Sequence, residues 1–227
     1  MIVYGKQIFT YIVDKHPHII KHVYVSKELD KKDFAKLRAL GIKVVRVDNK
    51  KAQSLSRGGN HQGVLLEIDD FLFATLQSIK EESFLVLLYG VTDVGNIGSI
   101  VRSAYALGAG GVVVSGLKSL KMEGVIRRSS GAALDLPIVL YPNLLDLMKE
   151  LQDSGTKIYG ADMQGEDVRK VHFVGKRAIL LGSEGEGLPK KALQKCDKRL
   201  QIKMEREFDS LNVAAAAAIF IDRMRDG

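Results

Sequence analysis

The residues best suited to chemistry lie in a glycine-rich acidic stretch, residues 182–189, that follows the apolar run 178–181. The apolar run predicts a strand buried on both faces, as in a parallel sheet covered by helices. Alternating glycines allow positive φ and close approach to a ligand or another segment, and loops after parallel strands bind ligands in open α/β sheets. The stretch has two carboxylates and no phosphate-loop lysine, so a phosphate site is excluded. A plain tight turn is the alternative interpretation.

Two further segments bring polar side chains to the starts of predicted helices. These side chains are Asn96 and Arg102 in residues 93–104, and Ser210 and Asn212 in residues 202–216. Taken singly, several have ordinary explanations. Asn96 can cap the helix that follows it, and Ser210 or Asp209 can cap the last helix. Arg102 alone would be a solvated helix residue, and Glu184 a turn residue.

The composition indicates a globular chain with a sizeable core. With 227 residues and 46% apolar content, the chain holds one large or two small domains. No run approaches the ~20 apolar residues of a membrane helix, and residues 1–10 lack a signal-peptide pattern, so we expect a cytoplasmic protein. A single cysteine, Cys196, rules out an internal disulfide. The net charge of +7 mildly favours a polyanionic partner.

The first 70 residues predict a small α/β sandwich of their own. The expected elements are a helix at 4–15, a strand at 22–26, a helix at 33–40, a strand at 43–47, a helix at 49–55 and a strand at 64–68. This segment has 13 basic and 8 acidic residues, so most of the excess positive charge lies in it.

The glycine-rich loop 57–63 of this unit carries side chains that suit RNA. Arg57, Asn60, His61 and Gln62 can contact phosphate, sugar or base edges, and the glycines expose backbone N–H groups. A polar connection before a strand is the alternative interpretation. The histidines of the unit lack acidic or cysteine partners at ligand spacing, so we expect no metal site.

After a junction at residues 71–83, which includes a short amphipathic helix, residues 84–227 alternate strands and helices. The expected strands are 84–89, 111–114, 137–140, 157–161, 178–181 and 200–202, and the expected helices are 97–107, 122–129, 144–151, one from 189 and one at 210–224. This alternation predicts a mostly parallel sheet with helices on both faces.

Residues 93–104, 182–189 and 202–216, in this order and spacing, resemble the three motifs of the SpoU (TrmH-like) branch of the SPOUT RNA methyltransferases. The N-terminal unit is similar to the substrate-binding domain of the family's 23S rRNA guanosine 2′-O-methyltransferases. The resemblance implies a deep trefoil knot in residues 84–227, bound S-adenosylmethionine, a homodimer and an RNA substrate. The implied reaction is 2′-O-methylation of a ribose, without a metal.

The resemblance also implies roles for individual residues. The implied catalytic residues are Arg102, Asn96, Glu184, Ser210 and Asn212, and the implied cofactor contacts are Gly182, Ile202, Met204 and Leu211. Because arginine stays protonated at neutral pH, we expect Arg102 to grip the target phosphate and orient the hydroxyl; family proposals also make it a base. Glu184 is expected to pair with Arg102.

The third motif departs from its relatives at three positions. Lys203 stands where proline is usual, Arg206 near the usual glycine, and Ala214 where serine is usual; in the first motif Val94 replaces a common proline. None of these positions is an expected catalytic residue. These substitutions would instead alter the loop that is expected to contact the cofactor.

Further cations are expected to extend the RNA surface, with a solvated face as the alternative. These residues are Lys118, Lys121, Arg127 and Arg128. Two other functions stay open at this point. One is a tRNA ribose methyltransferase of the same branch, and the other is a non-catalytic RNA-binding or ribosome-assembly module.

Overall fold

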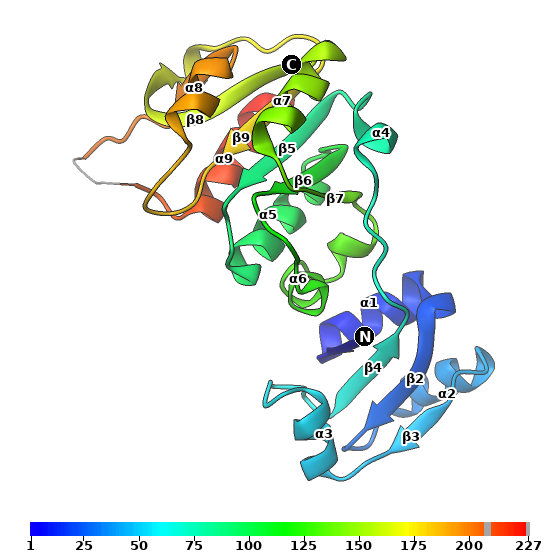
Figure 1. The fold of residues 1–227 in the computed structure, drawn as a ribbon. Coiled ribbons are helices and arrows are strands. Elements are labelled where there is room, and N and C mark those ends of the chain that lie inside the picture. Colours follow the sequence, from blue (N-terminus) through cyan, green and yellow to red (C-terminus); the bar gives the residue numbers. More distant parts are fainter. Residues whose placement is uncertain (207–209, 226–227) are drawn as a thin grey trace. The chain divides into compact units, whose positions relative to one another are not determined.

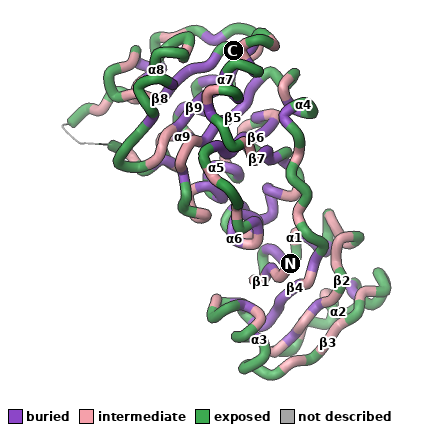
Figure 2. Tube along the Cα trace, viewed as in Figure 1, coloured by how far each residue is buried: buried purple, intermediate pink, exposed green. Residues whose placement is uncertain are grey.

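The computed structural model of the protein describes residues 1–206 and 210–225, and the chain forms two compact units (Figure 1). The first unit comprises residues 1–72 and 122–131, and the second comprises residues 73–121 and 132–227. Each unit has its own buried interior, which Figure 2 shows along the chain.

The first unit contains a four-stranded sheet in the order β1-β4-β2-β3. Its strands are β1 (Ile2–Tyr4), β2 (Ile20–Val25), β3 (Val44–Arg46) and β4 (Val64–Ile68), and its helices are α1 (Lys6–Lys15), α2 (Lys31–Ala39), α3 (Asn49–Leu55) and α6 (Met122–Arg128), with a 3-10 turn at Pro17–Ile19. Strand β4 runs antiparallel to both neighbours, whereas β2 and β3 are parallel. The expected α/β sandwich is present. Strand β1 was not predicted, because three residues are too few to show a period.

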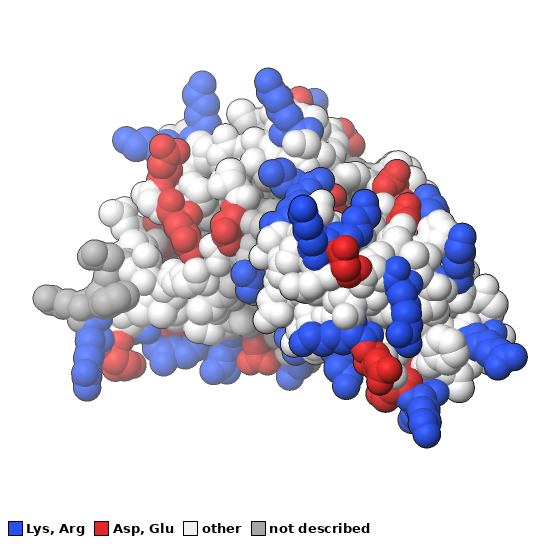
Figure 3. All heavy atoms as spheres, turned by 90° about the horizontal axis from the view of Figure 1, so that it is seen from below, with Lys and Arg blue, Asp and Glu red and all other residues white. Residues whose placement is uncertain are grey.

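The surface of the protein carries charges of both signs. Figure 3 shows Lys and Arg side chains spread over one face, with Asp and Glu between them. Two ion pairs of the first unit join exposed or half-exposed side chains, Lys21 with Asp69 and Lys36 with Asp14. Contacts with a polyanion must therefore come from local groups of cations that lack such partners.

The second unit contains a six-stranded parallel sheet in the order β10-β8-β9-β5-β6-β7. The strands are β5 (Phe84–Tyr89), β6 (Gly111–Ser115), β7 (Ile138–Tyr141), β8 (Lys157–Asp167), β9 (Arg177–Leu181) and β10 (Lys198–Gln201). The helices are α4 (Leu76–Ile79), α5 (Val94–Ala106), α7 (Leu144–Asp153), α8 (Lys190–Lys195) and α9 (Val213–Arg225), with 3-10 turns at Ala132–Leu134 and Val168–Lys170. The expected parallel α/β sheet is confirmed.

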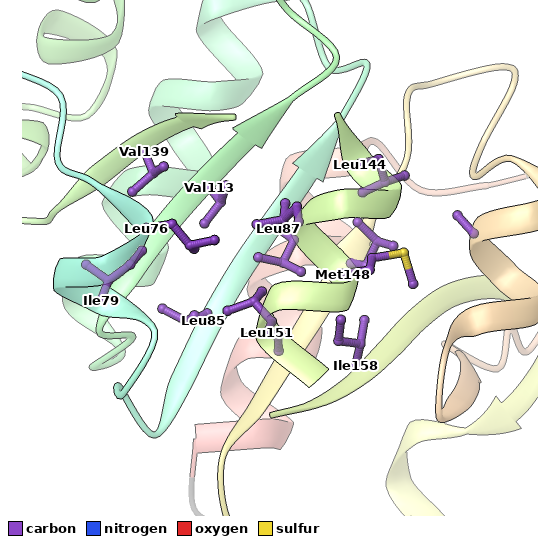
Figure 4. Packing of buried hydrophobic residues seen from close by; sticks show 14 of the residues in the cluster. Leu76, Ile79, Leu85, Leu87, Val113, Val139, Leu144, Met148, Leu151 and Ile158 are labelled. Atoms are coloured by element: carbon purple, nitrogen blue, oxygen red, sulfur yellow. The ribbon is translucent and has the colours of Figure 1, made fainter. Parts of the chain in front are cut away.

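Helices cover both faces of this sheet. On one face α4, α7 and α8 pack on alternate residues of the strands, among them Leu85 and Leu87 of β5 (Figure 4). On the other face α5 packs against α9, which also contacts β5 and β9. All residues of β9 are buried, as its apolar run predicted. The sheet therefore holds α5 and α9 side by side, next to the central pair of strands.

The C-terminal end of α9 is anchored by a buried arginine. Arg177 begins β9 and is 5% exposed, and its guanidinium donates hydrogen bonds to the carbonyl oxygens of Met224 (2.6 Å) and Arg225 (2.7 Å). These carbonyls lack partners within the helix, and a cation is favoured at this negative end of the helix dipole. Sequence reasoning missed this role, because the strand pattern alone gives no hint of what a buried arginine contacts.

Several elements differ in extent from their sequence predictions. The expected junction helix is reduced to α4, and Thr75, whose hydroxyl accepts a hydrogen bond from Ser78 N, caps it. Strand β8 is longer than expected because it pairs with β9 only at its start, whereas β10 pairs with it from Tyr159 as far as Asp167. Helix α9 begins at Val213, three residues later than expected.

An ion pair at the end of β8 makes a pH-dependent contribution to stability. Asp167 is buried, and its carboxylate receives hydrogen bonds from the guanidinium (2.8 Å) and backbone N–H (3.1 Å) of Arg169. These contacts lower the pKa of Asp167 to about 2. The ionised carboxylate therefore stabilises the folded state above the unfolded pKa of about 4, and this contribution is lost as pH falls through about 2.

We therefore expect Asp167→Asn to be less stable than the wild type at neutral pH, by an amount that shrinks as the pH falls below about 4. Urea unfolding of both proteins at a series of pH values from neutral to acidic measures this difference. A difference that stays constant over the series would contradict the assigned pair.

None of the helices within residues 1–206 and 210–225 is long and apolar enough to cross a membrane.

Candidate functional site

The candidate site lies at the edge of the sheet where the strand order reverses. Strands β5 and β9 are neighbours in register, with Leu88 opposite Leu181, so the loops that follow them leave the sheet together. A β-carbon built on Gly90 would lie 3.7 Å from Cβ of Ser183. The carboxyl edge of a parallel sheet at such a switch point is where open α/β folds bind ligands.

The loop after β9 is closed by its glycines. Gly187 N donates a 3.0 Å hydrogen bond to the carbonyl oxygen of Ser183, while Gly185 and Gly187 have φ of 98° and 65°. A β-carbon on Gly182 would lie 2.3 Å from the carbonyl carbon of Gly187, so only glycine fits there. The close approach and positive φ predicted for these glycines are confirmed. The close approach at Gly182 is to the loop itself.

Three expected catalytic residues form one hydrogen-bonded cluster. Glu184 Oε1 accepts hydrogen bonds from Asn212 Nδ2 (2.7 Å), Val213 N (3.1 Å) and Asn96 Nδ2 (3.3 Å). Asn212 Nδ2 also donates to Asn96 Oδ1 at 3.1 Å. Asn96 lies 88 positions from Glu184 and 116 positions from Asn212 along the chain, yet these side chains meet at one carboxylate. Glu184, which is exposed, connects the β9 loop to the first turns of α5 and α9.

The caps of the two helices explain why Asn96 and Asn212 point at Glu184. Helix α5 begins at Val94 and is capped by Asp93, whose carboxylate accepts a 2.7 Å hydrogen bond from Asn96 N. Asn96 therefore lies inside the first turn, and its side chain is not the cap. Asn212 Oδ1 accepts from Ala214 N at 2.9 Å and from Ala215 N at 3.4 Å, so Asn212 caps α9.

These caps show whether Asn96 and Ser210 are the N-cap residues that the sequence allowed. The N-cap interpretation of Asn96 is wrong, because Asp93 has that role. Ser210 precedes the helix start by three residues and is exposed, so it is not the cap either. Asp209 lies outside the described residues. The signal for the true cap of α5 was available in the sequence as an Asp three residues before the asparagine.

Arg102 lies on α5 and is exposed. It follows Asn96 by six residues, which corresponds to ~9 Å along the helix axis. The hydrogen bonds described at Glu184 come from the side-chain amides of Asn96 and Asn212 and from Val213 N, and the expected pairing of Glu184 with Arg102 stays a prediction. The cluster therefore holds the N-terminal turns of α5 and α9 in place, and α5 in turn carries Arg102.

The residues expected to hold the cofactor lie in loops and are half-buried. Gly182 follows β9, Ile202 and Met204 follow β10, and Leu211 precedes α9. Half-buried apolar side chains beside backbone that is outside helices and strands suit an adenine ring, which needs both apolar contact and backbone hydrogen bonds. The residues present therefore fit a nucleoside-containing methyl donor.

The loop expected to bind RNA is tied to the first unit by three of its residues. Gln62 Oε1 accepts a 2.9 Å hydrogen bond from Lys6 N, and a β-carbon on Gly59 would overlap the Tyr4 hydroxyl. His61 is 4% exposed and its Nδ1 accepts a 3.1 Å hydrogen bond from Gly63 N. The buried His61 ring therefore shapes the loop, and its expected contact with RNA stays a prediction. Arg57 and Asn60 are exposed.

The four further cations have different surroundings. Lys118 and Lys121 are exposed in the second unit, whereas Arg127 and Arg128 lie on α6 in the first. The Arg127 guanidinium lies 4.1 Å from the ring centroid of Tyr4 and donates from Nε to the carbonyl oxygen of Glu123. A cation over an aromatic ring is a structural contact, so Arg127 is partly engaged inside its own unit.

The chain has a parallel α/β sheet, and the glycine-closed loop at its switch point is hydrogen-bonded to the starts of two helices. Proteins with this architecture bind small ligands at the carboxyl edge of the sheet. The chain belongs to the SpoU rRNA methylase family, whose sequence profile matches residues 83–222. A second profile, for RNA 2′-O ribose methyltransferase substrate binding, matches residues 2–73. The chain is accordingly an RNA methyltransferase that uses S-adenosylmethionine.

Individual relatives agree with this assignment. The chain is 31% identical to a 23S rRNA (guanosine-2′-O-)-methyltransferase RlmB of Ralstonia nicotianae, over 82% of this chain and 78% of the relative. It is 29% identical to the RlmB of Yersinia pestis, over 96% and 94%. Among solved structures, an AdoMet-bound rRNA methyltransferase from Sinorhizobium meliloti superposes with a TM-score of 0.81 at 25% identity, covering 99% of this chain and 86% of that one.

Proposed function

We propose that the protein methylates the 2′-hydroxyl of a guanosine ribose in 23S rRNA. Relatives named as 23S rRNA guanosine methyltransferases match nearly the whole chain, including its first unit. Two tRNA enzymes of similar fold cover only 62% and 66% of this chain. The observation that carries the proposal is the cluster of Asn96, Glu184 and Asn212 at the switch point, since it organises the site beside Arg102.

The proposed mechanism needs positioning and one proton transfer, in which the 2′-hydroxyl gives its proton to water as its oxygen is methylated. S-adenosylmethionine, when bound, supplies an electrophilic methyl group on a sulfonium. Gly182, Ile202, Met204 and Leu211 hold the donor through backbone groups and apolar side chains. Arg102 grips a phosphate of the target nucleotide and orients its 2′-hydroxyl in line with the methyl group.

The polar cluster supports this arrangement. Glu184 fixes the first turns of α5 and α9, so the helix that carries Arg102 and the segment that carries Leu211 keep one relative position. Ser210 lies next to Leu211 and is assigned to the same site. Its hydroxyl can donate a hydrogen bond to the ribose or accept one from it. No step in this scheme requires a metal.

The proposal extends to the organisation of the chain. We assign residues 1–70 to RNA binding, residues 71–83 to a linker and residues 84–227 to a knotted catalytic domain that binds the methyl donor. The family profiles, which match residues 2–73 and 83–222, support this division. We further propose a homodimer that acts in the cytoplasm, where the rRNA substrate is made. The proposed RNA contacts are Arg57, Asn60, His61, Gln62, Lys118, Lys121, Arg127 and Arg128.

Incubation with methyl-labelled S-adenosylmethionine and either 23S rRNA or tRNA tests the proposed function. We expect label in 23S rRNA, on the ribose of a guanosine. Label in tRNA alone would show that the substrate class is wrong. Label in neither RNA, with intact RNA binding, would show a non-catalytic RNA-binding or assembly module.

A further inference from the structure

A groove on the first unit stands apart from the site described above. It has a volume of about 330 Å³ and opens where β2, α2 and β3 come together. Its lining residues come from the end of β2, the loop after it, the first turns of α2 and strand β3: Val25, Lys27, Glu28, Leu29, Lys31, Phe34, Val44 and Arg46. This volume is typical of small-molecule sites and is sufficient for a nucleobase with its ribose.

The aromatic ring in the groove is not used by the core. Helix α2 buries Leu37 completely, whereas Phe34, one turn earlier, is 51% exposed. The spacing of Phe34, Leu37 and Leu40 in the sequence is that of residues on one side of a helix. Leu37 packs in the interior, whereas Phe34 forms part of the wall of an open groove. An exposed aromatic face is the element on which unpaired bases stack.

The charges around Phe34 favour an anion. Lys27, Lys31 and Arg46 line the groove, and the ion pairs between described residues include none of them. Glu28 is the acidic residue of the lining. Three cations and one carboxylate give the groove a net positive charge around its apolar residues. The carboxylate of Glu28 can accept hydrogen bonds from the amino groups of bases.

One residue of the groove lining, Lys27, lies against the glycine-rich loop 57–63. Gly63 has φ of 91°, and a β-carbon there would lie 2.9 Å from Cβ and Cγ of Lys27, so the lysine stem lies against this glycine. Ser26 N also donates a 2.9 Å hydrogen bond to the carbonyl oxygen of Gly63. Lys27 therefore belongs both to the groove and to the edge of the loop that carries Arg57 and Asn60.

We propose that this groove binds one unpaired base of the RNA, stacked on Phe34, with the flanking phosphates held by Lys27, Lys31 and Arg46. The inference deepens the proposed function, on which it rests for RNA as the partner. It assigns the first unit a single-stranded contact rather than a duplex surface. Stacking is tolerant of sequence, because every base has a π-face, while the cations follow the backbone.

Binding of a fluorescein-labelled, 12-nucleotide single-stranded RNA of mixed sequence by the full-length protein tests the stacking contact. We expect Phe34→Ala to weaken binding about 5- to 150-fold, the range measured for loss of one base–aromatic stack, and Phe34→Trp to retain it. Leu40→Ala is the matched control, because Leu40 is a 43% exposed apolar residue at the end of the same helix and outside the groove lining. Binding by Phe34→Ala as tight as that by Leu40→Ala would overturn the inference.

The salt dependence of the same binding tests the phosphate contacts. Lys31→Ala should reduce the slope of log affinity against log salt by about 0.7, the value for one phosphate contact on a single strand. Lys32→Ala, one residue further along α2 and outside the lining, should leave the slope unchanged. Equal slopes for both variants would remove Lys31 from the RNA interface and overturn its assignment.

The failure of this inference is distinguishable from the failure of the proposed function. If the wild type methylates 23S rRNA and Phe34→Ala does so with the same KM, only the groove assignment falls. If Phe34→Ala methylates naked 23S rRNA normally but fails on ribosomal particles, the groove binds a protein, and the RNA assignment is overturned. A circular dichroism spectrum and a thermal unfolding curve of Phe34→Ala that match those of the wild type show that the first unit of the variant has folded.

Discussion

Replacing Arg102 with alanine is expected to lower the rate of methyl transfer by ~10³-fold or more, with little change in the affinity for S-adenosylmethionine. Arg102 is exposed on α5, so the substitution removes no buried group, and the helix keeps its cap at Asp93. The loss would arise because the target phosphate is no longer held in line with the methyl group. Single-turnover kinetics with labelled donor measure the chemical step, and calorimetry measures donor binding.

Arg102→Lys separates charge from geometry. A lysine keeps the positive charge but lacks the planar fork that binds a phosphate through two hydrogen bonds. We expect Arg102→Lys to recover part of RNA binding and little of the rate. Arg223→Ala, an exposed arginine on α9, is the matched control and should retain activity. Normal turnover by Arg102→Ala would show that the proposed mechanism has the wrong central residue.

The second large effect is expected for Glu184→Ala, which removes the acceptor shared by Asn96, Asn212 and Val213 N. Because Glu184 is exposed, water can replace its oxygen, and the free energy of unfolding should fall by only ~1 kcal/mol. The rate should fall by ~10²-fold, since the starts of α5 and α9 lose their common anchor. Thermal unfolding and steady-state kinetics measure the two quantities separately.

Glu186→Ala is the matched control for this prediction. Glu186 is an exposed carboxylate in the same loop, two residues from Glu184, and the hydrogen bonds of the cluster go to Glu184. The control changes the charge of the loop by the same amount. If Glu184→Ala and Glu186→Ala lose the same activity, the effect is one of charge, and the anchoring role of Glu184 is rejected.

Much of the fold could be predicted because the relevant signals are local. The apolar run before Gly182 specified a strand buried on both faces, and β9 is buried along its length. The alternation of strands and helices indicated a parallel sheet, which is present. Glycines at 182, 185 and 187 indicated a turn with positive φ and close approach of the backbone, and the φ values at Gly185 and Gly187 and the contact at Gly182 agree. Periodicity and glycine stereochemistry act over a few residues, so they are readable in the chain.

The boundaries of helices were predicted less well, because more than one residue can serve as a cap. Asp93 and Asn96 are both suitable N-cap residues, and only the folded chain shows that Asp93 caps α5. In the same way Asn212, not Ser210, caps α9. Because Asp93 caps α5, the side chain of Asn96 can donate a hydrogen bond to Glu184, so the choice of cap also affects the site.

The site itself depends on contacts that no local pattern contains. Asn96, Glu184 and Asn212 meet because β5 and β9 are adjacent in the sheet and α5 packs on α9, and the sequence shows neither pairing. The sequence also did not show which side chains are buried: His61, in a polar loop, is 4% exposed, whereas the aromatic Phe34 is 51% exposed in a groove. The local chain thus specified which elements form and where the turns lie. The tertiary structure decided which side chains face one another, because strand order and burial arise from packing between distant segments.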